Sequence, residues 1–142
     1  MNFLELFDSR DKKKRLSHIR NLMVLSLADG RLAKDEVDLV IKIGLNAGLT
    51  REELNRVISR PDSINFSPPE TSRERIEQLY DMVMVMMVDG DIDENEVNLC
   101  KIIANGLGFR PVIIDKMILE VIDVIVQGIA IDIAIERLLR SA

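Results

Sequence analysis

The sequence predicts an all-α protein: a compact single domain of about seven or eight helices, built from two repeats. Three observations support this fold class. Apolar residues recur at helical spacing almost throughout, glycines and prolines stand where such helices would end, and the chain matches itself when Asp29 is aligned with Asp89. A length of 142 residues suits one domain, and a 47% hydrophobic content is enough for a core.

The first half reads as helices punctuated by glycine. One helix face carries apolar residues at Val37, Val40, Ile41 and Leu45. Gly48 ends that helix, and Thr50 with Glu53 forms a capping box for the next one. Pro61 closes this helix and opens the Pro-, Ser- and Asn-rich loop at 61–69.

The second half follows the same pattern. Residues 82–88 are apolar on every side and predict a helix at the centre of the core. After Pro111, polar residues return at steps of four, three and four, which indicates a helix rather than a strand: Lys116, Glu120, Asp123 and Gln127. Gly128 breaks this region, and Asp132 is expected to cap a C-terminal helix at about 130–140.

The loop separates two similar units, repeat one at about 12–60 and repeat two at about 70–127. Residues 27–37 and 87–97 align without a gap, with these equivalent pairs: Asp29 and Asp89, Gly30 and Gly90, Leu32 and Ile92, Glu36 and Glu96. Gly48 and Gly108 continue the match. Because neither unit can bury its apolar stripe alone, the two should pack as a pseudo-symmetric pair with matching bends.

Each repeat has the same motif: an apolar helix, an Ala/Val-Asp-Gly turn, a Leu or Ile and a later Glu. Two such motifs in one chain resemble the TerB-like family of tellurite-resistance proteins. The resemblance spans about residues 12–127. It implies an all-α domain of about seven helices, and a bacterial cytoplasmic protein of stress response that acts as a scaffold or metal-sensing partner. The acidic residues of the family's two motifs would fall on Asp29, Glu36, Asp89 and Glu96.

Acidic residues in these motifs form the candidate metal site: Asp89, Asp91, Asp93 and Glu96, with Asp29 and Glu36 from the first repeat. Their oxygens suit Ca²⁺ or Mg²⁺, although no cofactor is required. The run from Asp89 matches the second half of an EF-hand loop, but Val85 and Met87 occupy the first ligand positions. The alternative is structural: the glycines take positive φ, and Asp93 with Glu96 forms a capping box. Arg31, Ala33 and Lys34 replace the extra acids in repeat one.

A basic stretch is the candidate partner-binding surface: Arg10, Lys12, Lys13, Lys14 and Arg15, followed by His18 and Arg20. It could dock an acidic protein or lipid headgroups as a peripheral contact, or it could be a solvated helix start capped by Asp8 or Ser9. His18 is expected to be solvated. A net charge of -5 and only 4% aromatic residues argue against nucleic-acid binding.

Cys100 is the only cysteine, so no intramolecular disulfide can form, and we expect it to be buried and inert. The sequence predicts neither a signal peptide nor a membrane span, and hence a soluble cytoplasmic protein. No phosphate loop, nucleophile elbow or zinc-protease motif is present. The expected function is a non-catalytic TerB-like interaction or regulatory module, linked to tellurite or general stress response, with a protein partner. The alternatives are a divalent-cation-binding protein and a carboxylate-dependent enzyme.

Overall fold

The computed structural model describes residues 3–30 and 33–142, with side chains from residue 10 onward. Within these ranges it contains helices and no strand, which confirms the all-α prediction. The elements are α1 (Phe3–Ser26), α2 (Lys34–Asn46), α3 (Arg51–Ser59), the short 3₁₀ helix η1 (Pro61–Ser63), α4 (Ser72–Met87), α5 (Glu94–Leu107), α6 (Pro111–Val126) and α7 (Ile131–Ser141).

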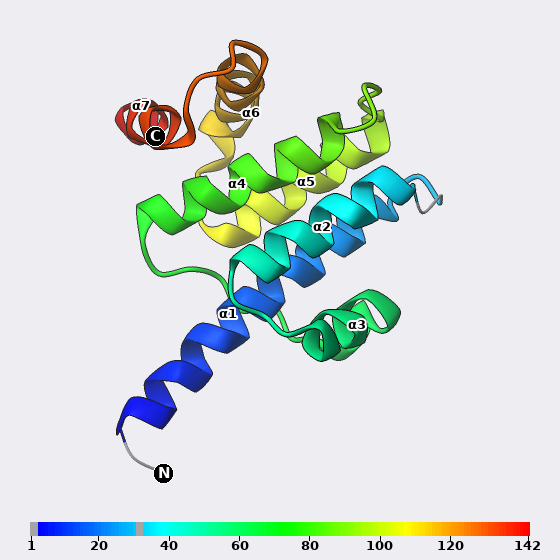
Figure 1. The fold of residues 1–142 in the computed structure, drawn as a ribbon. Coiled ribbons are helices and arrows are strands. Elements are labelled where there is room, and N and C mark those ends of the chain that lie inside the picture. Colours follow the sequence, from blue (N-terminus) through cyan, green and yellow to red (C-terminus); the bar gives the residue numbers. More distant parts are fainter. Residues whose placement is uncertain (1–2, 31–32) are drawn as a thin grey trace.

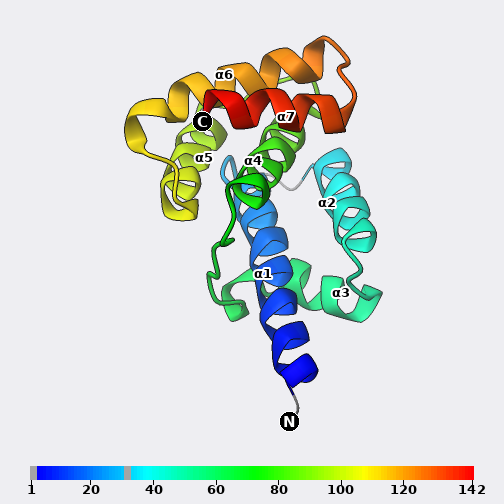
Figure 2. The same cartoon turned by 90° about the vertical axis from the view of Figure 1, so that its left-hand side faces the viewer.

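The two predicted repeats correspond to α1–α3 and α4–α6. Helices α1, α2, α4 and α5 form the centre of the molecule, where α1 contacts α4 and each also contacts the second helix of the other repeat. Figures 1 and 2 show α6 and α7 together at one end and α3 toward the other. No described helix combines the length and the apolar character that crossing a membrane requires.

The bends of the two repeats have matching conformations. Gly30 and Gly90 follow α1 and α4 with φ of 80° and 82°, values that glycine adopts without steric cost. The bends after α2 and α5 contain Gly48 and Gly108, with φ of 90° and 116°. The expected match thus holds at both pairs of glycines. The predicted partner of Ile92, Leu32, lies outside the described residues, as does Arg31.

The core is aliphatic and rich in methionine, as the composition predicts. Met82 and Met86 on α4 are buried, whereas Val88, just beyond the helix, is 40% exposed. The prediction that residues 82–88 form a helix at the centre of the core is therefore right for α4, which ends at Met87, and wrong for Val88. Cys100 is fully buried, and burial raises the pKa of its thiol to about 12, so the prediction of an inert cysteine is supported by its surroundings.

Two predicted helix starts differ from the structure. Helix α1 begins at Phe3 and continues through residues 8 and 9, so neither Asp8 nor Ser9 starts a helix. Helix α7 begins at Ile131 after Ala130, which places Asp132 in the first turn, where its charge favours the helix dipole without capping it. The capping box of Thr50 and Glu53 is present as predicted.

Candidate functional site

Two buried glutamates, one from each repeat, form the candidate site. Glu36 lies in the first turn of α2 and Glu96 in the first turn of α5, and each is only 2% exposed. Figure 1 shows the end of α1 and the start of α2 at the same end of the four central helices as the end of α4 and the start of α5. The duplication therefore brings the starts of α2 and α5 to one place, although the two glutamates belong to different halves of the sequence.

The two carboxyl groups are hydrogen-bonded to each other. Burial raises the pKa of Glu96 to about 8, with further contributions from the negative charges of Glu36 and Asp29. Burial also raises the pKa of Glu36, and the charge of Asp89 adds to this effect, while the hydrogen bond with Glu96 opposes it. Near neutral pH Glu96 therefore keeps its proton and can donate it to an oxygen of Glu36.

The aspartates of the two turns act across the boundary between the repeats. Asp89 affects Glu36 more strongly than Asp29 does, and Asp29 affects Glu96 more strongly than Asp89 does. The pKa of each glutamate is thus raised more by the aspartate of the opposite repeat than by the aspartate of its own repeat. We call Asp29, Glu36, Asp89 and Glu96 the carboxyl junction. Its two aspartates are exposed and its two glutamates are buried.

One oxygen in the carboxyl junction lacks a donor. The Oε2 atom of Glu96 is buried and accepts no hydrogen bond from any N–H or O–H group of the described residues. Leaving a buried carboxylate oxygen unsatisfied costs free energy, typically more than for a neutral group. A shared proton or a bound cation would supply the missing interaction.

The structure divides the predicted metal residues into two groups. Asp93 caps α5, because its Oδ1 atom accepts hydrogen bonds from the backbone N–H of Asn95 at 2.7 Å and of Glu96 at 3.4 Å. The Glu96 side chain completes no capping box and lies in the junction instead. Asp91 is exposed, and its N–H donates to the Asp89 Oδ1 atom at 3.1 Å, which shapes the turn. Asp91 and Asp93 therefore serve the turn and the cap.

No ready-made metal centre accompanies the junction. Among the described residues, no three His, Cys, Asp or Glu side chains are grouped so that they could hold a metal ion. The donors present at the junction are carboxylate oxygens, which hard cations such as Ca²⁺ and Mg²⁺ prefer. A cation there would need additional oxygens from the turns or from water.

The predicted basic surface is divided among contacts within the chain. Lys12 pairs with Glu53 at 3.0 Å, and Lys14 pairs with Glu70 at 3.1 Å. The Arg15 Nη1 atom donates to the carbonyl oxygen of Ala47 at 2.8 Å. These side chains hold α1 against α3, the inter-repeat connection and α2. Only Arg10 and Lys13 of the predicted set are exposed with no ion pair among the described residues.

His18 is buried, so the prediction that it is solvated is wrong. It is 9% exposed, and its Nε2 atom lies 2.8 Å from the Oδ2 atom of Asp81 on α4. This contact joins the two repeats. The charged neighbours of His18 in the sequence suggested solvent, but residues 16–19 are all buried, so this turn of α1 is covered on every side by the rest of the fold.

No family model, curated protein or solved structure matches this chain. The functional argument therefore rests on the carboxyl junction and on the surfaces around it.

Proposed function

We propose that the chain is a non-catalytic regulatory module of the TerB-like type, in which the carboxyl junction exchanges a proton for a divalent cation. The observation that carries this proposal is the buried Glu36–Glu96 pair where the repeats cross. A pair with a raised pKa retains a proton when no cation is present. Because metal ligands must be deprotonated, a cation that binds there releases that proton.

The donors support a hard cation, Ca²⁺ or Mg²⁺. The orphaned Oε2 atom of Glu96 offers one buried oxygen, and Glu36 offers carboxylate oxygens beside it. Asp29 and Asp89 are exposed and belong to the turns, so a cation would have to draw them toward the glutamates. Binding would then tighten the crossing of the two repeats, which is how we infer that a signal reaches the rest of the fold.

Thermal unfolding with and without cation tests this proposal. With a dissociation constant of about 0.1–1 mM, about 10 mM Ca²⁺ or Mg²⁺ should stabilise the fold by about 1.4–2.7 kcal/mol. The increase should be larger at about pH 9 than at about pH 6, because the proton competes with the cation. Glu96→Gln should abolish it, whereas Glu94→Gln, on the exposed side of the same turn, should retain it. An equal response in both variants, or no response to either cation, would contradict cation binding at the junction.

A second candidate function, protein interaction, is favoured by an apolar stripe on α6. Val112, Leu119 and Val126 recur at every seventh position and are 82%, 67% and 70% exposed. The positions equivalent to Val112 and Leu119 in repeat one are Glu52 and Ser59, which are exposed and polar. Exposed apolar side chains aligned on one helix face are typical of surfaces that meet a partner.

Catalysis is not part of the proposal, since glutamates that are 2% exposed offer no face to a substrate. A role in tellurite or general stress response, and a cytoplasmic location, stay predictions that depend on the resemblance and the composition.

A further inference from the structure

An open cleft of about 540 Å³ lies between α2 and α4, beside α1 and the start of α7. Its volume is in the range of small-ligand and peptide sites. Asn46 of α2 and Glu77 of α4 stand on its two walls, and His18 lies between them. The cleft is separate from the carboxyl junction, and none of its lining residues belongs to the junction.

The internal repeat predicts a second, equivalent groove elsewhere in the molecule, and that groove is occupied by a segment of the chain itself. The alignment of the two repeats makes Ser17 the equivalent of Glu77 and Gly106 the equivalent of Asn46, so the equivalent groove lies between α1 and α5. The connection between the repeats fills that groove. The Ser67 N–H donates to the Ser17 Oγ atom at 2.7 Å, and the Phe66 ring lies 3.3 Å from where a Cβ on Gly106 would stand.

The chain in the filled groove is extended. No helix covers residues 64–71, and Figure 2 shows this connection beside α1, on the side away from α2. Arg20 fastens it by donating to the Ile64 carbonyl oxygen at 3.2 Å and by lying over the Phe66 ring. One of two equivalent grooves thus holds an extended segment of the protein itself, and the other is open.

We propose that the open cleft between α2 and α4 binds an extended peptide segment of a partner protein that carries a basic side chain. The glutamate at position 77 stands where Ser17 accepts a backbone N–H in the filled groove, and Asn46 and Gln78 add side-chain amides. Ile43 and Ile131 give the cleft an apolar wall. Backbone hydrogen bonds and an apolar wall are the usual means of holding an extended peptide.

The charge of the cleft selects a basic side chain. Its lining carboxylates are Asp11, Glu74, Glu77 and Asp81. Two of its cationic groups pair with carboxylates, Lys14 with Glu70 and His18 with Asp81, whereas Arg15 donates to the neutral Ala47 carbonyl and keeps its charge. The four lining carboxylates outnumber Lys14 and Arg15, so the cleft has an excess of negative charge.

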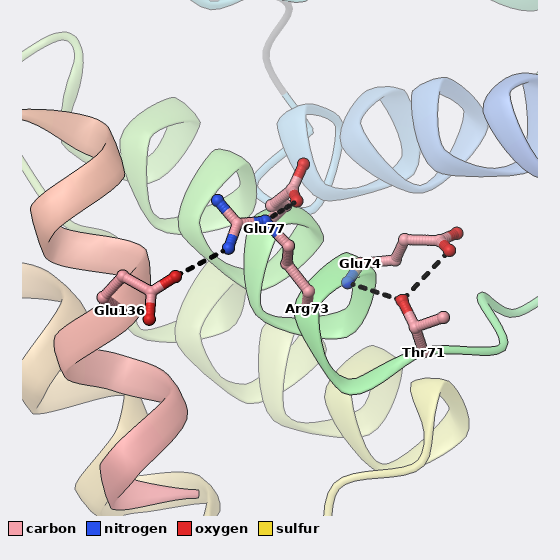
Figure 3. A network of polar contacts seen from close by, with 5 residues as sticks. All are labelled: Thr71, Arg73, Glu74, Glu77 and Glu136. Atoms are coloured by element: carbon pink, nitrogen blue, oxygen red, sulfur yellow. Dashed lines mark hydrogen bonds and ion pairs between the residues drawn. The ribbon is translucent and has the colours of Figure 1, made fainter.

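Two of the carboxylates are held in place at the cleft. Figure 3 shows Thr71, a neutral residue, donating to Glu74, so the charge of that carboxylate is not cancelled there. Figure 3 also shows Arg73 between Glu77 and Glu136 of α7, at 3.3 Å and 3.0 Å, so one arginine serves two carboxylates. A lysine or arginine side chain from a partner would balance the remaining negative charge.

A library of short random peptides displayed on phage and selected against the full chain tests this inference. We expect enriched sequences to contain Lys or Arg beside Pro or an aliphatic residue, and to shift the NMR signals of the Asn46 and Gln78 side-chain amides. The variants Asp11→Lys and Glu77→Lys should each weaken binding of a selected peptide by about tenfold or more, which corresponds to ~1.4 kcal/mol. Asp38→Lys, an exposed position of α2 outside the cleft, is the matched control and should bind as the wild type does.

Three results would overturn the inference: no enrichment, enrichment of acidic sequences, or binding that both cleft variants leave unchanged. Circular dichroism of each variant separates loss of the peptide site from loss of the fold. Because the carboxyl junction is not involved, a Glu96→Gln protein should bind the same peptides, and failure of cation binding would leave this inference standing.

Discussion

Glu96→Gln should change how the stability of the fold depends on pH. The folded-state pKa of Glu96 is about 8, whereas the ordinary value is 4.5. A raised pKa means that the folded state holds the proton more tightly than the unfolded state does. The stabilisation is therefore complete below about pH 4.5 and is lost as the pH rises through about 8.

The interval of about 3.5 pH units, at about 1.4 kcal/mol each, sets an upper bound of ~5 kcal/mol on that loss. We expect about 2–4 kcal/mol, because water that enters the junction would relieve part of the charge. Glutamine keeps the shape and can donate a hydrogen bond to Glu36 without titrating. The free energy of unfolding of Glu96→Gln should therefore change much less between about pH 5 and pH 9.

Urea unfolding followed by circular dichroism at five pH values across this range measures the effect. Glu94→Gln is the control, since its side chain is exposed on the same turn, and it should follow the wild-type curve. The reasoning would be refuted if wild-type stability stayed level or rose toward pH 9, or if Glu96→Gln lost as much stability as the wild type does.

Three further predictions concern the fold and its surfaces. Thr50→Ala should lower the free energy of unfolding by about 0.5–2 kcal/mol in urea titrations, because it removes the cap of α3. Thr50→Ser keeps the capping hydroxyl, so a smaller loss for Thr50→Ala than for Thr50→Ser would contradict the capping box. Cys100 should not react with a thiol reagent at about pH 8 until the chain is unfolded, and rapid labelling of the native protein would contradict its burial. Leu119→Glu, at an exposed position of α6, should alter the free energy of unfolding by no more than about 0.5 kcal/mol. Met117→Ala, at a fully buried position of the same helix, should lower it by about 2–5 kcal/mol, and equal losses in calorimetry would argue against an exposed stripe on α6.

Much of the fold could be predicted because its signals are local. Gly48 and Gly108 mark helix ends that need a positive φ, and Pro111 marks a helix start, wherever the helices pack. The match between the two halves of the sequence also predicted which bends would be alike. The start of α1 was missed because the basic residues suggested a solvated helix start capped by Asp8 or Ser9, whereas the helix already begins at Phe3. The partners of these basic residues, such as Glu53 for Lys12, come from distant parts of the chain and could not be predicted from the stretch itself.

The sequence predicted which residues belong to the candidate site but not which of them come together. Sequence proximity joined Asp91 and Asp93 to Glu96, but a cap and a turn account for both aspartates. Two acids in equivalent positions meet only when the repeats cross, and no periodicity within one repeat reports that crossing. The buried His18–Asp81 contact was missed for the same reason, because its partners come from different repeats.

The central claim is that Glu36 and Glu96 share a proton where the repeats cross. Carbon-13 NMR of the glutamate side-chain carboxyls across the pH range observes that proton directly. The account predicts that the pair titrates together, with one apparent pKa near about 8 that disappears in Glu96→Gln. Two independent titrations, both near the ordinary glutamate value of 4.5, would contradict it.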